Sequence, residues 1–327
     1  MNHELCVALV MAKIITVTFN PTIDKSTSID ALIPEKKLHC SEPTFEPGGG
    51  GINVARAIKK LGGEATAIYP AGGYSGKFLN ELMSREGVPV NPIETKSHTR
   101  ENLIVFDRST NQQYRFGMPG SEVREEEWRR VLEVLEESNP DYIIASGSLP
   151  PGVPVDIFSK VASIAKNKNA KLIIDTSGEA LKKAVDTGVY LIKPNLAELS
   201  SLVGIEEVHH EKVYDIARDI ISRKCCQAVM VSLGPAGAML ITKDEVYHAI
   251  PPVVKRLSTV GAGDSMLAGV VLSLAAGKSL KEALQYGVAC GTAATLNPGT
   301  ELCKLEDVER LYKIISMPVP LKPGNSI

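Results

Sequence analysis

The stretch "STVGAGDSM" (258–266) places Gly261, Ala262 and Gly263 before Asp264 and an apolar run with helical character. The first turn of a helix exposes backbone N–H groups without intrahelical partners and carries partial positive charge. Small residues let an anion approach these groups, so the stretch predicts a cradle for a phosphoryl group in transit. Asp264 would repel a bound phosphate, and a general base that deprotonates an attacking hydroxyl explains its place better. A carboxylate that only caps a core helix is the alternative.

A second candidate is the run of four glycines in "FEPGGGGINVARAIKKLGG" (45–63), which precedes another helical pattern. Glycines allow a polar ligand to approach the backbone closely. Asn53 on the first helical turn can form a hydrogen bond with a ligand hydroxyl. The simpler interpretation is a flexible loop, but Asn53 and Arg56 open a well-patterned helix, which favours a binding role.

A third candidate is "IKPNLAEL" (192–199), in which Asn195 and Glu198 lie three residues apart at a helix start. Their oxygens could organise hydrated Mg²⁺ beside a triphosphate, and Lys193 could reach a phosphate. A capping pair is the more ordinary interpretation of this spacing. The turn "SLGPAGA" (232–238) could pass beneath a nucleotide or be a plain hairpin. The P-loop and G-x-G-x-x-G motifs are both missing from the chain.

Elements that could position these residues alternate along the chain. Short β-branched runs and amphipathic stretches follow one another, which predicts an α/β fold with a doubly wound, mostly parallel sheet and helices on both faces. The predicted strands are 14–19, 65–71, 142–146, 171–176, 189–194 and 228–233. The predicted helices are 52–61, 74–86, 122–137, 154–167, 178–186, 211–223, 263–276 and 279–296.

Two regions break this alternation, at about 24–45 and 99–120, where short polar strands and turns have no helix between them. Strands that alternate polar and apolar residues suit a small sheet with one face open to water. We interpret both insertions as one lid over a single domain that spans 1–327. A pair of ordinary surface hairpins is the alternative.

Composition restricts the class of protein. The chain has 327 residues, of which 44% are hydrophobic, and a net charge of −2. Because no basic tract or acidic tail stands out, nucleic acid and membrane surfaces are not expected partners. The six cysteines have neither C-x-x-C nor zinc-finger spacing, which indicates reduced thiols and a cytoplasmic protein. Residues 6–11 are too few for a membrane helix, Met11 could be an alternative start, and the Pro-rich tail from 316 is expected to be a loose end.

Taken together and in order, these segments resemble the PfkB family of sugar kinases, also called the ribokinase family. "PGGGGINVARAIKKLG" is similar to its first signature and "STVGAGDSMLAG" to its second, with further matches in "TFNPTIDK", "KPNLAEL" and "SLGPAGA". The likeness extends roughly from Lys13 to Leu311. Within the family, "QYRFGMPG", "DTSGEAL" and the uninterrupted glycine run resemble the minor bacterial 6-phosphofructokinases.

This resemblance implies a ribokinase-like α/β core with a β-sheet lid that often doubles as a dimer surface. It implies Asp264 as the base and Gly261, Ala262 and Gly263 as the anion hole. The sugar and its phosphate would meet Asp24, Gly49, Gly50, Asn53, Arg100, Arg115, Ser148 and Lys37. ATP would meet Lys193, Asn195, Ser232, Gly234 and Gly237, with Mg²⁺ held through water by Asn195 and Glu198. A K⁺ loop would comprise Ser258, Val260, Ala294, Asn297 and Gly299, although Glu301 replaces the arginine expected there.

The implied activity is ATP-dependent phosphorylation of fructose 6-phosphate in glycolysis, by a homodimer or a higher oligomer. Tagatose-6-phosphate kinase and 1-phosphofructokinase remain alternatives of the same class. A sugar-phosphate or nucleotide sensor without catalysis is the alternative of a different class, against which the intact Asp264 argues.

Overall fold

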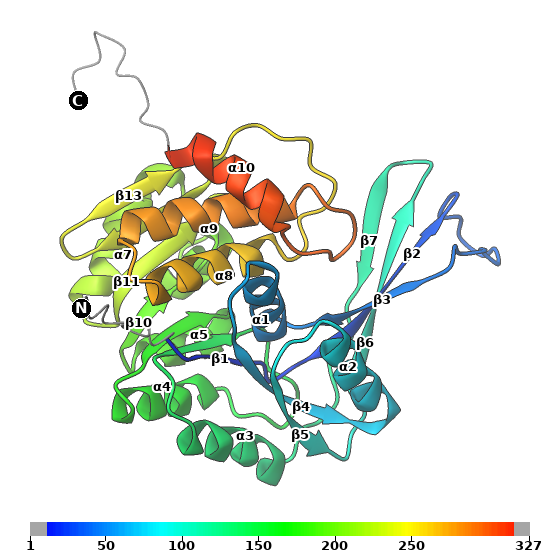
Figure 1. Ribbon diagram of the computed structural model, residues 1–327, viewed down its shortest axis with the longest axis horizontal. Helices are drawn as coiled ribbons and strands as arrows, with labels where there is room; N and C mark the ends of the chain where they lie inside the picture. The colour runs from blue at the N-terminus through cyan, green and yellow to red at the C-terminus, as the bar shows by residue number, and fades with distance from the viewer. Residues whose placement is uncertain (1–11, 317–327) are drawn as a thin grey trace, which may run out of the picture.

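The computed structural model describes residues 12–316, and the predictions for Cys6–Met11 and for the tail fall outside that range. Within it, a nine-stranded sheet forms the centre of the molecule (Figure 1). Its strands, in spatial order, are β13 (Val246–Ala249), β12 (Ala238–Thr242), β11 (Cys226–Ser232), β10 (Val189–Ile192), β9 (Lys171–Asp175), β8 (Tyr142–Ser146), β1 (Ile14–Val17), β4 (Thr66–Gly72) and β5 (Val90–Thr95).

All neighbours from β11 to β5 pair in parallel, and only the β11–β12 and β12–β13 pairs are antiparallel. Parallel strands need crossover connections, which the helices between them provide. The central strands are buried on both faces, as their nearly continuous apolar runs require. The predicted doubly wound, mostly parallel sheet is therefore confirmed.

Helices cover both faces of this sheet in two separate apolar layers (Figure 1). One layer contains α1 (Gly50–Lys60), α2 (Gly73–Arg85), α8 (Ala262–Ala275), α9 (Leu280–Ala294) and α10 (Leu305–Ser316). The other contains α3 (Glu125–Glu137), α4 (Ile157–Asn167), α5 (Gly178–Val185), α6 (Leu196–Val203) and α7 (Val213–Ser222). Adjacent strand residues divide between the layers, since Ile143 packs in the second and Ile144 in the first.

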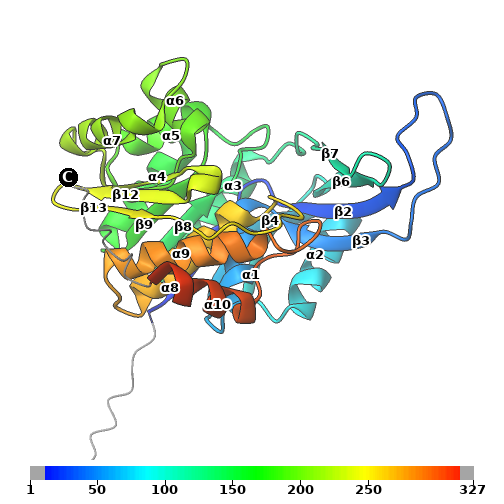
Figure 2. The same ribbon diagram turned by 90° about the horizontal axis from the view of Figure 1, so that it is seen from above.

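The lid is a separate four-stranded sheet that projects from one end of the molecule (Figures 1 and 2). In spatial order its strands are β3 (Thr44–Gly48), β2 (Thr22–Ile29), β6 (Arg100–Asp107) and β7 (Gln112–Phe116). β2 pairs in parallel with β6, although 70 residues of chain from Asp30 to Thr99 separate them. The two insertions predicted from sequence therefore form one sheet, not two independent hairpins.

Each predicted strand and helix overlaps an observed one, with ends that differ by a few residues. The sequence interpretation did not include β5, β13 or α10, and it gave α6 only as a helix start at Asn195. Two one-turn helices, His210–Lys212 and Gly234–Ala236, complete the list of elements in the described part of the chain. Between residues 12 and 316, no helix combines the length and the apolar character that crossing a membrane requires.

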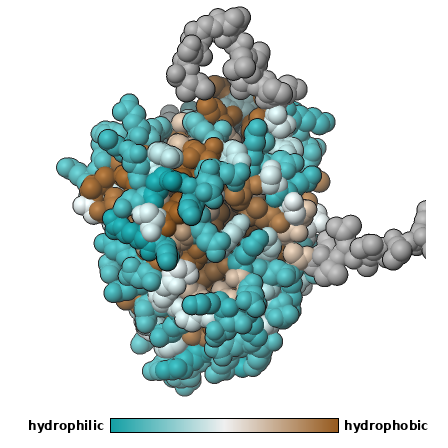
Figure 3. Space-filling model, turned by 90° about the vertical axis from the view of Figure 1, so that its left-hand side faces the viewer, coloured by the Kyte–Doolittle hydropathy of each residue, from teal (hydrophilic) through white to brown (hydrophobic). Residues whose placement is uncertain are grey.

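The face opposite the lid has an ordinary mixed surface. Figure 3 shows apolar residues gathered in the middle of this face and hydrophilic ones around them. An open depression lies at the amino-terminal ends of β9 to β11, and Tyr190 and Leu280 are among the residues that line it. Asp264 lies on the opposite side, toward the carboxyl ends of the strands. The predicted functional residues therefore do not gather there. Asp264 and the predicted residues that surround it lie at the carboxyl edge, where ligands of open α/β sheets bind.

Candidate active site

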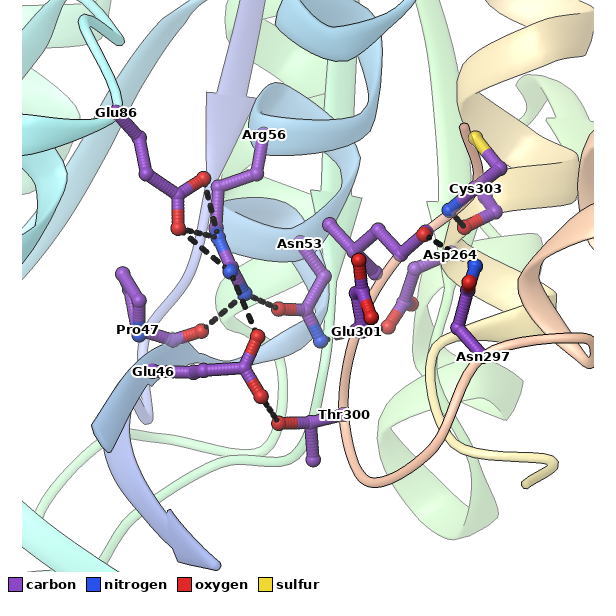
Figure 4. Close-up of polar contacts among 12 residues, drawn as sticks. Glu46, Pro47, Asn53, Arg56, Glu86, Asp264, Asn297, Thr300, Glu301 and Cys303 are labelled. Carbon is purple, nitrogen blue, oxygen red and sulfur yellow. Dashed lines mark hydrogen bonds and ion pairs between the residues drawn. The ribbon is translucent and has the colours of Figure 1, made fainter. Parts of the chain in front are cut away.

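Asp264 lies on the first turn of α8, as predicted. Gly261 precedes the helix in a left-handed conformation with φ of 72°, and its side-chain-free backbone allows the chain to enter the helix there. Asp264 makes no capping hydrogen bond to this helix, so the structure does not support the capping alternative. Its Oδ2 accepts a hydrogen bond of 2.9 Å from Nδ2 of Asn53 on α1 (Figure 4).

The Asp264 carboxyl has an unusually high pKa. Removal from water raises it to about 6, and the nearby carboxylate of Asp175 adds to this effect. The Asn53 hydrogen bond and the charge of Lys193 act in the opposite direction. A carboxylate whose pKa lies just below neutral pH is ionised there yet still basic enough to accept a proton, which suits a general base.

Lys193, at the end of β10, forms an ion pair of 3.1 Å between its Nζ and Oδ1 of Asp175 at the end of β9. Burial disfavours the ammonium, but the charge and hydrogen bond of Asp175 outweigh this and raise the pKa of Lys193. A Cβ atom added to Gly263 would lie 3.4 Å from this Nζ. The ammonium therefore lies against the predicted anion cradle, where an anion could contact both.

The residues predicted for the sugar gather between the lid and α1. Asp24 on β2 is 7% exposed, and its Oδ1 accepts a 3.0 Å hydrogen bond from Nδ2 of Asn102 on β6. Burial raises the pKa of Asp24, and the Asn102 hydrogen bond partly offsets this. A Cβ at Gly50 would lie 2.2 Å from Oγ of Ser146, so at least this glycine is needed for close packing as well as for any ligand.

The two lid arginines predicted for the sugar phosphate, Arg100 and Arg115, differ in their contacts. Arg100 donates hydrogen bonds to the carbonyls of Met118 at 2.7 Å and Asn20 at 3.0 Å, so it already ties the lid base together. Burial lowers the pKa of Arg100, and the charge of Asp24 acts against that. Arg115 on β7 is exposed and donates to Oγ1 of Thr259 over a distance of 3.3 Å. Because Thr259 lies two residues before Gly261, this contact connects the lid to the segment that leads into the anion cradle.

Ser148 and Lys37 are the remaining residues predicted for the sugar phosphate. Ser148 follows β8, and its Oγ accepts a 3.0 Å hydrogen bond from Nδ2 of Asn20. Lys37 lies in the exposed loop between β2 and β3, which extends from the lid away from the main sheet (Figure 2). The structure of the single chain therefore brings Ser148, but not Lys37, to the other predicted residues.

On the nucleotide side, Asn195 and Glu198 form a reciprocal capping box at the start of α6. Oδ1 of Asn195 accepts from the Glu198 N–H, and Oε2 of Glu198 accepts from the Asn195 N–H, both at 2.9 Å. Burial raises the pKa of Glu198. Ser232 lies beside Asn195 through an isolated bridge, and the turn at Gly234–Gly237 joins the antiparallel β11 and β12. The capping and hairpin interpretations are thus correct, and both leave side-chain oxygens or backbone free for a ligand.

Among the five residues predicted for K⁺, Ser258 is hydrogen-bonded to Val260 and Gly299, and Asn297 is hydrogen-bonded to Ala294. Ser258 Oγ donates to the Gly299 carbonyl at 2.7 Å and accepts from the Val260 N–H at 3.2 Å. The Asn297 N–H donates to the Ala294 carbonyl at 3.2 Å. Carbonyl and hydroxyl oxygens are the donors that K⁺ takes in proteins, so the residues fit this ion. The described residues include no group of three or more His, Cys, Asp or Glu arranged to hold a metal ion.

Glu301, where the resemblance led us to expect an arginine, forms a 3.1 Å ion pair with Lys304. The five cysteines between residues 12 and 316 are free thiols, and Cys6 lies outside the described range.

A family model described as pfkB family carbohydrate kinase matches residues 17–307. The chain belongs to the PfkB family. This PfkB chain is 46% identical to ATP-dependent 6-phosphofructokinase isozyme 2 of Escherichia coli over 94% of its own length and 100% of the relative. It is 39% identical to the isozyme 2 of Mycobacterium tuberculosis over 94% of its length and 91% of the relative. The predicted family and its 6-phosphofructokinase subgroup are confirmed.

Solved structures agree. The E. coli phosphofructokinase-2 in complex with potassium matches with a TM-score of 0.91 and 45% identity, over 94% of this chain and 100% of that one. The same enzyme in complex with fructose-6-phosphate matches with a TM-score of 0.89 and 43% identity, over the same shares. Arabidopsis thaliana ribokinase, at 20% identity and a TM-score of 0.74 over 93% and 99% of the two chains, confirms the ribokinase-like fold.

Two residues of the PfkB site were missed by sequence reasoning. Asp175 pairs with Lys193, and its charge acts on Asp264. It ends a predicted parallel strand, and an acidic residue at that edge was a usable signal. Asn102, which holds Asp24, offered none, because its partner lies 78 residues away on another strand.

Proposed function

We propose that this protein transfers the γ-phosphoryl group of ATP to the C1 hydroxyl of fructose 6-phosphate, which gives fructose 1,6-bisphosphate. One observation carries the proposal: a carboxylate with a raised pKa, Asp264, stands in the first turn of α8 beside the buried ammonium of Lys193. The E. coli phosphofructokinase-2, similar over its whole length, has been solved with fructose-6-phosphate and with substrates and products.

In this reaction Asp264 accepts the proton of the C1 hydroxyl. Asn53 donates to Oδ2, so we assign Oδ1 as the proton acceptor. The N–H groups of Gly261, Ala262 and Gly263 and the Lys193 ammonium stabilise the charge on the transferring group. Phosphoryl transfer depends mainly on such positioning and charge stabilisation and needs no covalent intermediate.

For ATP, we propose that Lys193, Asn195, Ser232, Gly234 and Gly237 form the binding surface. Mg²⁺, when bound, would neutralise the phosphates. One Glu198 oxygen is committed to the capping box, which leaves the other for a water ligand of the ion.

We further propose K⁺ at Ser258, Val260, Ala294, Asn297 and Gly299. When bound, this ion would hold the backbone that leads into the anion hole. A K⁺-dependent rise in thermal stability at fixed ionic strength, absent with tetramethylammonium, would support the site. Equal melting temperatures in both salts would contradict it.

For the acceptor, we propose that Asp24, Gly49, Gly50 and Asn53 hold the sugar hydroxyls. The phosphate would contact Arg115 and Ser148, while Arg100 shapes the pocket from the lid base and contributes charge. Lys37 would reach the phosphate only if the lid loop moved toward the site.

We propose a cytoplasmic homodimer that forms through the lid. The lid exposes the apolar side chains of Leu32, Ile33, Phe106, Phe116 and Met118, an unusual concentration for a sheet in water. The inhibited form of E. coli phosphofructokinase-2 is described as tetrameric, so a higher oligomer is also compatible. Sedimentation equilibrium of the purified chain tests this, and a monomer at micromolar concentration would contradict it.

The decisive experiment is an ADP-release assay with fructose 6-phosphate, tagatose 6-phosphate and fructose 1-phosphate as acceptors. We expect the highest kcat/KM with fructose 6-phosphate. A preference for fructose 1-phosphate would favour 1-phosphofructokinase, the activity of relatives that are 30–31% identical to this chain. Binding of these ligands without ADP release would favour the sensor alternative.

A further inference from the structure

Arg56 of α1 is the largest fully buried side chain in the described part of the protein, with 1% of its surface exposed. The activity proposed above gives it no role. Its guanidinium nevertheless lies between α1, α2 and the lid strand β3 (Figure 4).

Glu86, directly after α2, anchors the guanidinium. It accepts from Nε of Arg56 at 2.9 Å and from Nη2 at 2.6 Å. A bidentate pair of this kind fixes the plane of the guanidinium and so fixes the directions of its remaining N–H groups.

Those remaining groups reach the lid and the sugar site. Nη1 donates to the carbonyl of Pro47 at 2.6 Å and contacts Oδ1 of Asn53 at 3.4 Å. Since Oδ1 of Asn53 faces Arg56, its Nδ2 is the atom that donates to Asp264. Arg56 thus orients the amide that holds the base.

A second branch leaves from Nη2, which pairs with Oε1 of Glu46 on β3 at 3.3 Å. The other oxygen of Glu46 accepts a hydrogen bond from the hydroxyl of Thr300 (Figure 4). Thr300 is 3% exposed and follows Gly299, whose carbonyl is bonded to Ser258. Glu46 therefore connects the lid strand to the loop at 297–301.

We propose that Arg56 is a positioning residue that, with Glu46 and Thr300, fixes the lid strand β3 relative to the base Asp264 and the loop at 297–301. The consequence for catalysis rests on the proposed function, because the acceptor sugar would lie between β2, β3 and Asp264. The fixing of β3 itself does not depend on which sugar phosphate is used.

The test uses Glu46→Gln, Thr300→Val, the double variant and Arg56→Lys, each made in the full chain. Hydrogen exchange of the β3 amides, measured without nucleotide or sugar, reports how firmly the strand is held. We expect faster exchange in β3 in all four variants, with α4 unchanged. This readout stays valid even if fructose 6-phosphate is not the acceptor.

Kinetics with the acceptor that the wild type prefers gives the second readout. Each single variant at Glu46 or Thr300 should lower kcat/KM by about tenfold, the effect of losing a hydrogen bond to a charged group. The kcat/KM of the double variant should be no more than about twofold below that of the less active single variant, because the two substitutions remove the same link.

Glu127→Gln is the matched control. Glu127 of α3 is a buried carboxylate that accepts backbone N–H groups of Lys96 and Arg124, at 2.8 and 2.7 Å, neither of which belongs to α1, β3 or the loop at 297–301. It should leave β3 exchange and kcat/KM unchanged. Unchanged β3 exchange in Thr300→Val and Glu46→Gln, or additive losses of about 100-fold in the double variant, would overturn the proposal.

Discussion

Lys193 and Arg56 are both buried cations near Asp264, but their surroundings differ. Within the described residues, the Lys193 ammonium has one side-chain partner, Asp175, and otherwise faces Gly263. Arg56 instead directs its guanidinium at two carboxylates, a carbonyl and an amide. A cation with donors to spare can bind a substrate, whereas one whose donors are all occupied holds parts of the protein together.

The largest expected effect lies on the Lys193 side, at the base itself. Asp264→Asn should lower kcat by at least about 100-fold, because the amide cannot accept the hydroxyl proton. Its melting temperature should not fall, since a carboxyl that burial destabilises has been replaced by a neutral group. Steady-state kinetics checks the change in kcat, and a thermal melt of the purified variant checks its stability. Near-normal turnover would show that Asp264 is not the general base.

Lys193→Met should reduce kcat/KM for ATP by about 100-fold, as expected when a charge that stabilises the transition state is lost. It should also destabilise the fold by about 3 kcal/mol, because Asp175, whose side chain is only 13% exposed, is left without its counter-charge. Adding Asp175→Asn should restore most of the stability and none of the activity. Denaturant unfolding measures the stability and steady-state kinetics measures the activity. If the double variant recovered both, Lys193 would have a structural role, like Arg56.

Arg115→Ala should lower kcat/KM for fructose 6-phosphate by about 10- to 150-fold, the range for losing a charge-assisted contact. Residual activity on free fructose should change much less, and the melting temperature should hold because Arg115 is exposed. Arg100→Ala is the contrast, since its contacts with the lid carbonyls should make it affect both acceptors. Equal losses for the two sugars in Arg115→Ala would place this arginine with the positioning residues.

The smallest effect concerns pH. The proposed base must be ionised to work, and its pKa is raised to about 6. Therefore kcat/KM should be constant just above neutral pH and fall about tenfold for each pH unit well below 6. Measurement of kcat/KM from pH 5 to 8 at constant ionic strength checks this. A fall at low pH that persists in Asp264→Asn would come from the titration of another group.

Local patterns were enough to predict much of the fold. Strand β8 was predicted with its observed ends, Tyr142–Ser146, because a short β-branched run between turn residues has few other uses. Helix α10 was missed since it follows an irregular stretch, and β5 was missed because Pro92 interrupts its pattern. The capping box of Asn195 and Glu198 was predicted correctly because it needs only residues three apart.

The sequence by itself determined the chemistry of the signatures: small residues before Asp264 and a glycine run before Asn53. Only the tertiary structure decided which distant groups act on them. Asn53 meets Asp264 across 211 residues, and Thr300 meets Glu46 across 254. Neither spacing produces a periodic pattern in the sequence. Such contacts form because the parallel strands and the two lid insertions bring distant segments of the chain together at one edge of the sheet. The raised pKa of Asp264 is likewise a property of the neighbours that the fold assembles around it.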